Sequence, residues 1–353
     1  MGDRSDLVRG IEIQAAGCDT YGSPFSAGIL RAVALDLAEG GPAKTLFQPW
    51  LDASARSVLG GAVPLRLLGG LHDLVLSGDT PGLAALYPRP ASPGDAETAW
   101  PRAREAMIEH GARLADFMTH EPQTNEVRRT ACLLPGFLTV ARETGLPMRC
   151  FELGASAGLN QLWDRFGYRY GDAATWGDVA ASVVVDAEWS GPPAPWDAAV
   201  SVSSRGACDR KPVDLADPLA RRRLRAYVWP DQADRLSRVD AAIAEAMAAG
   251  IVVDAEDAVS WCRRRATPTF GAATVLYHSV FWQYMPVDSQ ATLTEVIGAH
   301  GAAASRTAPF AWLRMEPDPG NLAVMALRLT IWPSGEERRL ATVHPHGARV
   351  DWH

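Results

Sequence analysis

The segment FELGASAGLN, residues 151–160, joins an acidic residue to a turn of small residues at a spacing that can bind a ligand. An apolar run precedes the turn and a helical pattern follows it, so the turn should link a strand to a helix. Gly154 and Gly158 would let the backbone approach a ligand closely, and the next helix would present free N–H groups. Glu152 at the strand end can bind an ammonium group, and the GxGxxG spacing used for pyrophosphate is missing. If the segment binds a nucleotide-like ligand and is not merely a tight turn, a ligand with a cationic amino-acid tail therefore suits it better than a phosphate.

The same turn also has the pattern Gly154-x-Ser156-x-Gly158, which is that of the nucleophile elbow in α/β-hydrolases. A serine hydrolase is therefore an alternative function. It would need an acid and a histidine later in the chain, and the candidates are Asp257 or Asp318 with His344 or His346. Two observations disfavour it. The sequence before residue 146 is helical in pattern, which leaves no earlier strands to carry an elbow, and the stretch LLGGLHD is not a convincing oxyanion loop.

The elements that position this turn change character near residue 145. Residues 24–145 have a helical pattern broken by glycine and proline, and Gly69 and Gly70 inside it indicate close approach of another helix or of a ligand. From residue 146, apolar runs alternate with helical segments, which is typical of a parallel sheet with both faces covered. The final runs around the turn SGEE read as a β-hairpin. We expect a helical N-terminal domain at 1–145 that closes over the substrate, and an α/β domain at 146–353.

The segment FELGASAG resembles the first motif of class I S-adenosylmethionine-dependent methyltransferases, an acidic residue followed by any residue and a glycine-rich loop. The order of elements from about 146 to 352 is also similar to their fold, terminal antiparallel hairpin included. The resemblance implies a Rossmann-like seven-stranded sheet and S-adenosylmethionine as cofactor. Ser156 departs from it, because glycine is commoner there. Longer stretches, among them QTNEVRR, HSVFWQYMP and HPHGARVDW, resemble an uncharacterised bacterial family catalogued as a domain of unknown function.

The methyltransferase resemblance implies a set of cofactor-binding residues at the first strand end, the loop, and the ends of later strands. These residues are Glu152, Gly154, Ser156, Gly158, Asn160, Asp209, Asp257 and Ser279. Asp209 would end the second strand and bind the ribose, and Asp257, with Asp254 as second choice, would bind the adenine amino group. Both Asp209 and Asp257 could instead cap the helices that follow them.

The position of the second strand has an alternative. If it ends at Asp209, residues 165–200 must be an insertion, such as a small β-hairpin. If SVVVDAEW is the second strand, Asp186 or Glu188 would take the ribose role. Ser156 and the long insertion also leave open a methyltransferase-like fold that binds a ligand without catalysis.

The substrate is expected to be a small molecule, and its identity is open. Polar residues near the expected cleft could position it, namely Asn125, Glu126, Arg129, Gln283 and Glu316. His278 and Tyr284 are the candidates for handling a proton, although methyl transfer depends mainly on orientation and exclusion of water. The alternatives are structural: a helix cap at Thr124 or Asn125, a core histidine at 278, and a pair between Arg314 and Glu316.

Composition narrows the classes of partner. The net charge of −7 gives no electrostatic reason to expect nucleic acid, and no apolar run approaches the roughly 18 residues of a membrane-spanning helix. The five cysteines are scattered without a CxxC pair, which disfavours disulfides and a zinc–thiolate site. His344 and His346 lack a defined third metal ligand. We expect a cytoplasmic protein without a metal.

Overall fold

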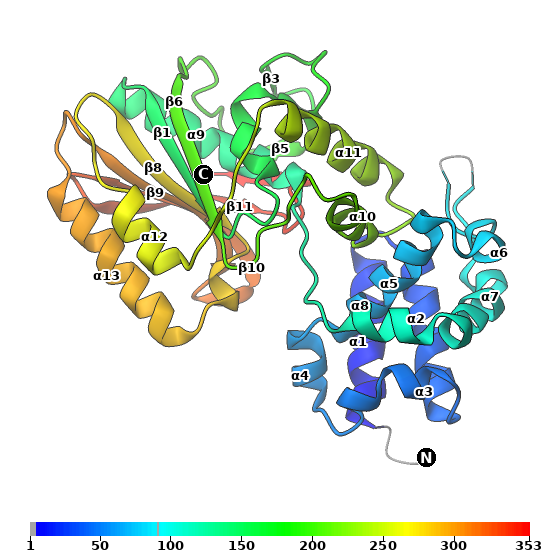
Figure 1. The fold of residues 1–353 in the computed structure, drawn as a ribbon. Coiled ribbons are helices and arrows are strands. Elements are labelled where there is room, and N and C mark those ends of the chain that lie inside the picture. The colour runs from blue at the N-terminus through cyan, green and yellow to red at the C-terminus, as the bar shows by residue number, and fades with distance from the viewer. Residues whose placement is uncertain (1–4, 90–91) are drawn as a thin grey trace. The chain divides into compact units, whose positions relative to one another are not determined.

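The computed structural model describes residues 5–89 and 92–353. The chain divides into two compact units: the described residues of Met1–Thr124 with Ala216–Asp240, and Asn125–Leu215 with Ala241–His353. Helices make up the first unit, and the second contains the large sheet (Figure 1). The division differs from the predicted boundary after residue 145. The helix at 130–144 belongs to the sheet-containing unit, and residues 216–240 return to the helical one.

The first unit packs its helices around a large apolar core, and a smaller apolar cluster contains Phe117, Ala226 and Tyr227. Ser5 begins the first helix and Asp95 begins the seventh, because each side chain accepts hydrogen bonds from backbone N–H groups of the first turn. Pro24 occupies the first position of the second helix, where its missing N–H costs nothing. The helices are α1 (Asp6–Thr20), α2 (Pro24–Ala38), α3 (Ala43–Leu46), α4 (Ala55–Gly60), α5 (Val63–Ser77), α6 (Pro81–Ala84), α7 (Ala96–Glu109), α8 (Gly111–Met118) and α10 (Pro218–Ala226). Helix α9 (Thr130–Thr144) lies in the second unit, and the chain passes from the first unit into the second within α11 (Ala233–Ala248).

Two glycines of α5 permit close packing. A Cβ atom at Gly69 would lie 2.7 Å from the ring of Tyr227, and one at Gly70 would lie 2.8 Å from Leu114 of α8. Both distances are shorter than any normal carbon–carbon contact. The predicted close approach of another helix is therefore confirmed.

Residues 216–240 join the first unit through polar contacts with α5. The Nδ1 atom of buried His72 lies 3.0 Å from the carbonyl oxygen of Val228. The buried carboxylate of Asp73 accepts a hydrogen bond from Nε of Arg222 at 2.7 Å. Buried polar groups need such partners, and both pairs hold the later segment against the helical core.

The second unit contains a nine-stranded sheet in the order β5-β12-β11-β10-β9-β8-β1-β6-β7 among the described residues. The run β7-β6-β1-β8-β9 is parallel, and β9 to β12 are antiparallel. The strands are β1 (Met148–Leu153), β5 (Glu188–Ser190), β6 (Val202–Asp209), β7 (Asp254–Ala255), β8 (Ala273–Ser279), β9 (Phe310–Asp318), β10 (Asn321–Trp332), β11 (Glu336–Val343) and β12 (Arg349–Trp352). The fold is therefore α/β with a mostly parallel sheet. The sheet has nine strands among the described residues where seven were expected: the predicted second arm of the hairpin forms two strands, β11 and β12, and β5 pairs with β12 at the edge.

Helices cover both faces of the sheet. Tyr277 of β8 contacts Phe137 of α9 (Thr130–Thr144), whereas the neighbouring Leu276 lies in the core that includes Trp261 of α12 (Ala258–Arg265) and Leu293 of α13 (Val287–Ala303). Successive side chains of a strand point to opposite faces, so α9 covers one face and α12 and α13 the other. Figure 1 shows α12 and α13 running along their face of the sheet. The predicted covering of both faces is confirmed.

Residues 165–200 contain a separate small sheet, formed by β2 (Gly167–Tyr170), β3 (Ala174–Trp176) and β4 (Val184–Asp186). They stand between β1 and β6 in the chain, as predicted for an insertion. β6 pairs directly with β1, whereas β4 pairs with β2 and Glu188 begins β5 at the sheet's far edge. The second strand of the large sheet therefore ends at Asp209. The alternative ending at Asp186 or Glu188 is wrong.

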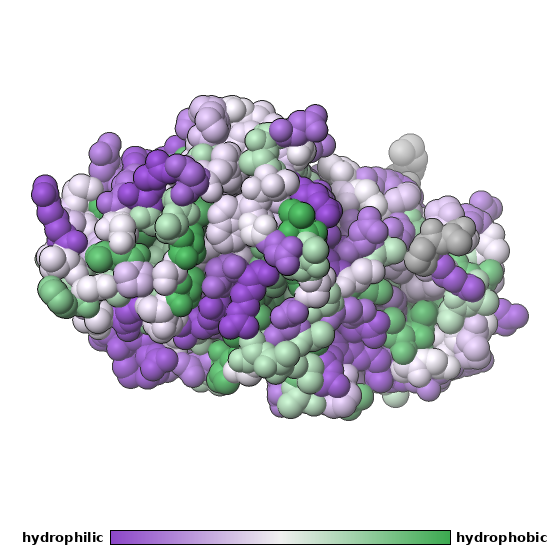
Figure 2. Space-filling model, turned by 90° about the horizontal axis from the view of Figure 1, so that it is seen from above, coloured by the Kyte–Doolittle hydropathy of each residue, from purple (hydrophilic) through white to green (hydrophobic). Residues whose placement is uncertain are grey.

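Figure 2 shows one face of the molecule. On the face seen in Figure 2, hydrophilic and hydrophobic residues alternate over short distances. No helix of residues 5–89 and 92–353 is long and apolar enough to cross a bilayer. All five cysteines are buried and free.

Candidate functional site

The turn after β1 has three residues in the left-handed backbone region. Gly154, Ser156 and Gly158 have φ values of +65°, +54° and +74°. This conformation is easy for glycine but costs serine about 1–2 kcal/mol. The turn is nevertheless fixed, since the Ser156 N–H donates to Oδ2 of Asp209 at 2.9 Å and the Ser156 carbonyl accepts from the Val213 N–H at 3.1 Å. The helix that follows is the 3-10 helix η3 (Leu159–Arg165).

Two polar atoms beside this turn are buried without a protein partner. Oγ of Ser156 and Oδ1 of Asn160 form no hydrogen bond within the part of the chain that the structure describes, and their residues are 6% and 2% exposed. Nearly all buried polar groups in folded proteins are hydrogen-bonded, so such atoms call for a missing partner. A ligand or an ordered water at the turn would supply one.

Asn125 and Glu126 lie against the same turn. Oδ1 of Asn125 accepts from the N–H of Leu159 at 2.9 Å, and the carbonyl of Glu126 accepts from Nδ2 of Asn160 at 3.5 Å. Both residues are buried. The structure thus brings two of the predicted substrate residues to the helix that follows the turn of residues 154–158, with Asn125 satisfying the first N–H of η3.

Glu152 is a buried carboxyl at the end of β1. It is 3% exposed, and the hydroxyl of Tyr277 donates to its Oε2 at 3.4 Å. Burial, reinforced by the negative charge of Asp209, raises the pKa of Glu152 to about 8. Glu152 is therefore protonated near neutral pH, and a cationic group placed beside it would favour its ionised form.

Asp209, at the end of β6, and Asp257, directly before α12, both accept hydrogen bonds from backbone N–H groups. Asp209 uses both carboxylate oxygens, accepting from the N–H of Ser156 and, at 2.9 Å, from that of Lys211. Asp257 caps α12 by accepting from the N–H of Ser260 at 3.0 Å, which holds its pKa below the ordinary value. Asp254 accepts from Nε1 of Trp261 at 2.6 Å. The helix-capping alternative for Asp257 is thus what the structure shows.

His278 is enclosed by hydrogen-bond partners. Its Nδ1 lies 2.6 Å from Oε1 of Glu316, and its Nε2 lies 3.0 Å from Nε1 of Trp312. An indole N–H can only donate, so Nε2 of His278 accepts from Trp312. Nδ1 therefore carries the ring proton and donates a hydrogen bond to Oε1 of Glu316. The side chain has no exposed surface. This arrangement supports the core-histidine alternative, because neither ring nitrogen is open to a substrate.

Glu316 also binds the backbone where the chain turns after β8, at Val280 and Phe281, which we call the corner. Its Oε1 accepts from the N–H of Phe281 at 2.9 Å, directly after Val280, whose φ of +52° is unusual for a β-branched residue. Arg314 does not pair with Glu316, contrary to one alternative. It pairs with Glu337 and covers the ring of Trp312.

The corner places Phe281 on the glycine loop. A Cβ atom at Gly154 would lie 2.2 Å from Cδ2 of Phe281, so the ring packs directly on the Gly154 backbone. Gly154 is therefore required both for its φ and for this contact. The ring covers part of the loop that a ligand would approach.

The remaining predicted residues lie at the periphery of this arrangement. Tyr284 is 68% exposed in the 3-10 turn η4 (Trp282–Tyr284), and Gln283 beside it is also exposed. Ser279 is partly buried at the end of β8, and Arg129 donates through Nε to the carbonyl of Pro345 at 3.0 Å. These residues are not gathered around one group. Their roles stay predictions.

The hydrolase alternative lacks its assembled triad. Oγ of Ser156 contacts no hydrogen-bonding partner among the residues described, so no histidine is placed to activate it. Nδ1 of His344 accepts from the N–H of His346 at 3.1 Å, and Asp318 pairs with Arg328. Across residues 5–89 and 92–353, no three His, Cys, Asp or Glu side chains form a metal-binding group.

Sequence reasoning missed three contributors: Tyr277, Phe281 and Trp312. Tyr277 precedes His278 in an apolar strand, and its partner Glu152 is far away in the sequence although β1 and β8 are neighbours in the sheet. Phe281 and Trp312 act through contacts between elements far apart in the chain. Strand alternation would have placed Trp312 and Glu316 on one face of β9, but it could not have supplied their partner.

The second unit is thus an α/β unit whose parallel strands reverse their order at β1 and place a left-handed turn there, which is where sheets of this kind bind ligands. Residues 9–352 match the family described as "Uncharacterized protein conserved in bacteria (DUF2332)", and the chain belongs to that family. The predicted similarity to an uncharacterised bacterial family is confirmed. No curated protein and no solved structure matches the chain.

Proposed function

We propose that the second unit binds S-adenosylmethionine at the turn of residues 154–158 and transfers its methyl group to a small molecule. The observation that carries the proposal is the left-handed turn at the β1 switch point, with two buried polar atoms, Oγ of Ser156 and Oδ1 of Asn160, that no described residue of the chain satisfies. This position is where ligands bind in such sheets. The resemblance of FELGASAG to the first methyltransferase motif supports the choice of ligand.

The residues at the turn fit the chemistry of this cofactor. Glu152 offers a buried carboxyl for the ammonium group, and Ser156 and Asn160 offer a hydroxyl and an amide oxygen. Asp209 stands at the end of the neighbouring strand, where a carboxylate can accept from ribose hydroxyls. When bound, the cofactor supplies an activated methyl group. The chain's own contribution is to orient the acceptor and exclude water, for which no general base is required.

One feature of the structure must change for binding at the loop. The Phe281 ring rests on Gly154, so full access to the turn requires this ring to rotate or the corner at Val280 to move. Asn125 and Glu126, which already contact η3, would then stand beside the bound ligand.

The test is calorimetric titration with S-adenosylmethionine and S-adenosylhomocysteine. We expect micromolar binding in the wild-type chain and at least about tenfold weaker binding in Gly154→Val, where the side chain would meet the Phe281 ring and strain the left-handed turn. Asp209→Asn tests the ribose contact: its amide oxygen still accepts from the Ser156 N–H, while the oxygen that accepts from the Lys211 N–H, and that would accept from a ribose hydroxyl, is replaced by a donor. Absence of binding by either ligand at millimolar concentration would contradict the proposal.

Two further assays on the same protein distinguish the proposed methyltransferase from a non-catalytic ligand-binding protein and from a serine hydrolase. A ligand-binding protein without catalysis would bind S-adenosylhomocysteine but consume no S-adenosylmethionine with any acceptor in a metabolite mixture. A serine hydrolase would be labelled by a fluorophosphonate probe, and Ser156→Ala would abolish the labelling. The Ser156 hydroxyl has no hydrogen-bond partner among residues 5–89 and 92–353, which disfavours the hydrolase.

A further inference from the structure

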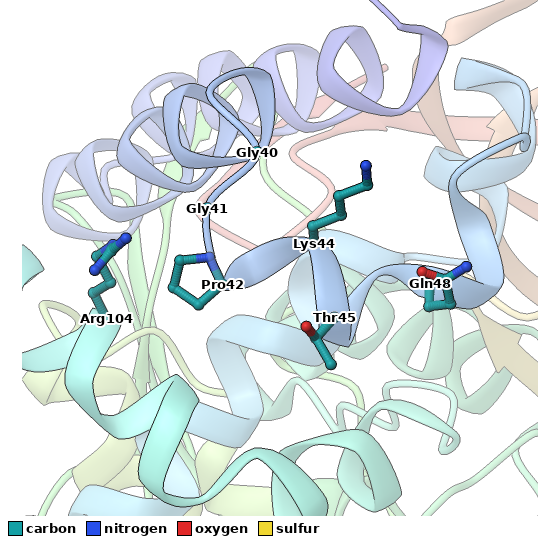
Figure 3. A pocket seen from close by; sticks show the side chains of 7 residues that line it. All are labelled: Gly40, Gly41, Pro42, Lys44, Thr45, Gln48 and Arg104. Atoms are coloured by element: carbon teal, nitrogen blue, oxygen red, sulfur yellow. The ribbon is translucent and has the colours of Figure 1, made fainter.

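We propose that the first unit contains a second ligand site, which binds a phosphate-bearing small molecule through Lys44 and Arg104. The site is a surface pocket of about 520 Å³. Its lining residues come from the turn between α2 and α3, from α3 and the residues after it, and from α7: Gly40, Gly41, Pro42, Lys44, Thr45, Gln48 and Arg104 (Figure 3). All of them belong to the first unit, so this site does not depend on the function proposed for the sheet.

A buried carboxylate shapes this pocket. Asp36 is 7% exposed at the end of α2, where its Oδ2 accepts from the N–H of Ala43 at 3.0 Å and its Oδ1 accepts from Nε of Arg104 at 2.7 Å. A Cβ atom at Gly41 would lie 2.2 Å from Oδ1 of Asp36. The turn is therefore folded tightly around the carboxylate, which only a glycine at position 41 allows.

Asp36 fixes the orientation of Arg104 and leaves its terminal donors free. Arg104 uses Nε for Asp36, and its side chain is 44% exposed. Within the described residues neither Nη group has a hydrogen-bond partner. A guanidinium held through Nε presents a planar pair of N–H donors, which suits two oxygens of one phosphate group.

Lys44 supplies the second positive charge. It is exposed on α3 and forms no ion pair with any residue the structure describes. In the view of Figure 3, Lys44 and Arg104 flank the turn of Gly41 and Pro42, with the hydroxyl of Thr45 below it. Two cations on either side of a turn favour a ligand with more than one anionic oxygen, such as a phosphate or diphosphate group.

The pocket is positively charged, whereas the chain as a whole is negatively charged. The chain as a whole carries a net charge of −7, and lysine occurs only at positions 44 and 211 among its 34 basic residues. Two cations and one compensating carboxylate leave this pocket with a net positive charge. An anion would otherwise be repelled by the chain's average charge.

The near absence of lysine provides a direct test, because amine acetylation reports on Lys44 and Lys211 as separate peptides. The full-length protein is treated briefly with acetic anhydride, with and without inorganic pyrophosphate at constant ionic strength. We expect pyrophosphate to slow acetylation of Lys44 at least about fivefold by engaging its ammonium group, and to leave Lys211 unchanged. Equal slowing at both lysines, or none at Lys44, would overturn the proposal.

Matched variants separate binding from folding. Arg104→Gln should abolish the protection of Lys44, whereas Arg102→Gln should retain it, because Arg102 lies on the same helix, pairs with Glu105 and does not line the pocket. Since Arg104 also holds Asp36, Lys44→Gln provides a second measurement that leaves that contact intact. We expect calorimetry to show pyrophosphate binding at least about tenfold weaker in Lys44→Gln than in the wild type. Unchanged affinity there would contradict the site.

Discussion

The indole N–H of Trp312 donates to Nε2 of His278 over 3.0 Å, and this single bond determines the state of the histidine. Because the indole has no acceptor, Nε2 must be unprotonated and Nδ1–H must face Glu316 at 2.6 Å. The pair Trp312 and His278 therefore directs Glu316, which in turn holds the Phe281 N–H at the end of β8. His278 was predicted to handle a proton, but in the structure it orients Glu316, which accepts from the Phe281 N–H and so holds the backbone after β8.

We expect Trp312→Phe to weaken this corner. The change leaves Nε2 of His278 buried without a donor, which costs about 1–3 kcal/mol of unfolding free energy. Urea unfolding measures the loss, and ¹⁵N chemical shifts of labelled histidine identify which ring nitrogen carries the proton. A protonated Nε2 in the wild-type protein would contradict the assignment.

Phe281 should control access to the glycine loop. We expect the thiol introduced by Ser156→Cys to react slowly with a maleimide, and at least about fivefold faster when Phe281→Ala is added, because the aromatic cover of Gly154 is lost. The natural cysteines give little background, since all five are buried and burial raises their pKa, that of Cys132 to about 12. No ligand is needed for this measurement.

The matched control is Tyr284→Ala, which removes an aromatic side chain that is 68% exposed in the same turn. It should leave the labelling rate unchanged. Equal acceleration by both variants would show that the turn loosens generally and that the Phe281 ring is not the cover.

Close packing at α5 predicts opposite effects for two glycine substitutions in the first unit. Gly69→Ala should lower the unfolding free energy by about 1–3 kcal/mol, because its methyl group would meet the Tyr227 ring at 2.7 Å. Gly111→Ala in the first turn of α8 should be neutral or stabilising by up to about 1 kcal/mol, since nothing lies within 4 Å of the added atom. Thermal and urea unfolding compare them. Equal losses would contradict the packing at Gly69.

Local patterns were sufficient to predict the parts of the second unit that are local in the chain. The apolar run before Glu152, the small residues of the turn and the strand ending at Asp209 all have signals within a few residues. The helix at 130–144 was assigned to the wrong unit because periodicity shows that a helix has an apolar face, but not which core covers it. Three-residue strands such as β5 have no recognisable pattern at all.

The candidate site was less predictable than the fold for the same reason. The positions of Glu152, Ser156 and Asn160 followed from one motif. The contacts of Phe281 with Gly154 and of Trp312 with His278 join separate strands and turns, and each is decided by side-chain packing in three dimensions. A single sequence contains no spacing rule for them.

Burial of Glu152 should make stability depend on pH. Its pKa of about 8 in the folded chain lies above the ordinary value of 4.5, so between these values the folded state binds more protons than the unfolded state. The free energy of unfolding therefore falls as pH rises through this window, by up to about 1.4 kcal/mol per pH unit from this group. The stabilisation is complete below the lower value and is lost above the upper one.

Glu152→Gln has no proton to lose and should lack this slope. Urea unfolding at about pH 5.5, 6.5 and 7.5 should show the variant gaining on the wild type as pH rises, whereas Glu295→Gln at an exposed position of α13 should track the wild type. A constant difference between Glu152→Gln and wild type would show that Glu152 ionises as it does in water.

Release of the Glu152 proton on binding can show whether the ligand's ammonium group lies beside this carboxyl. If the ammonium group of S-adenosylhomocysteine lies beside Glu152, binding lowers the pKa of that carboxyl and releases a proton near pH 7. We expect the calorimetric heat of binding to differ between buffers of different ionisation enthalpy, and this difference to vanish in Glu152→Gln. Binding whose heat is the same in all buffers would place the ammonium group away from Glu152, even if the cofactor itself binds.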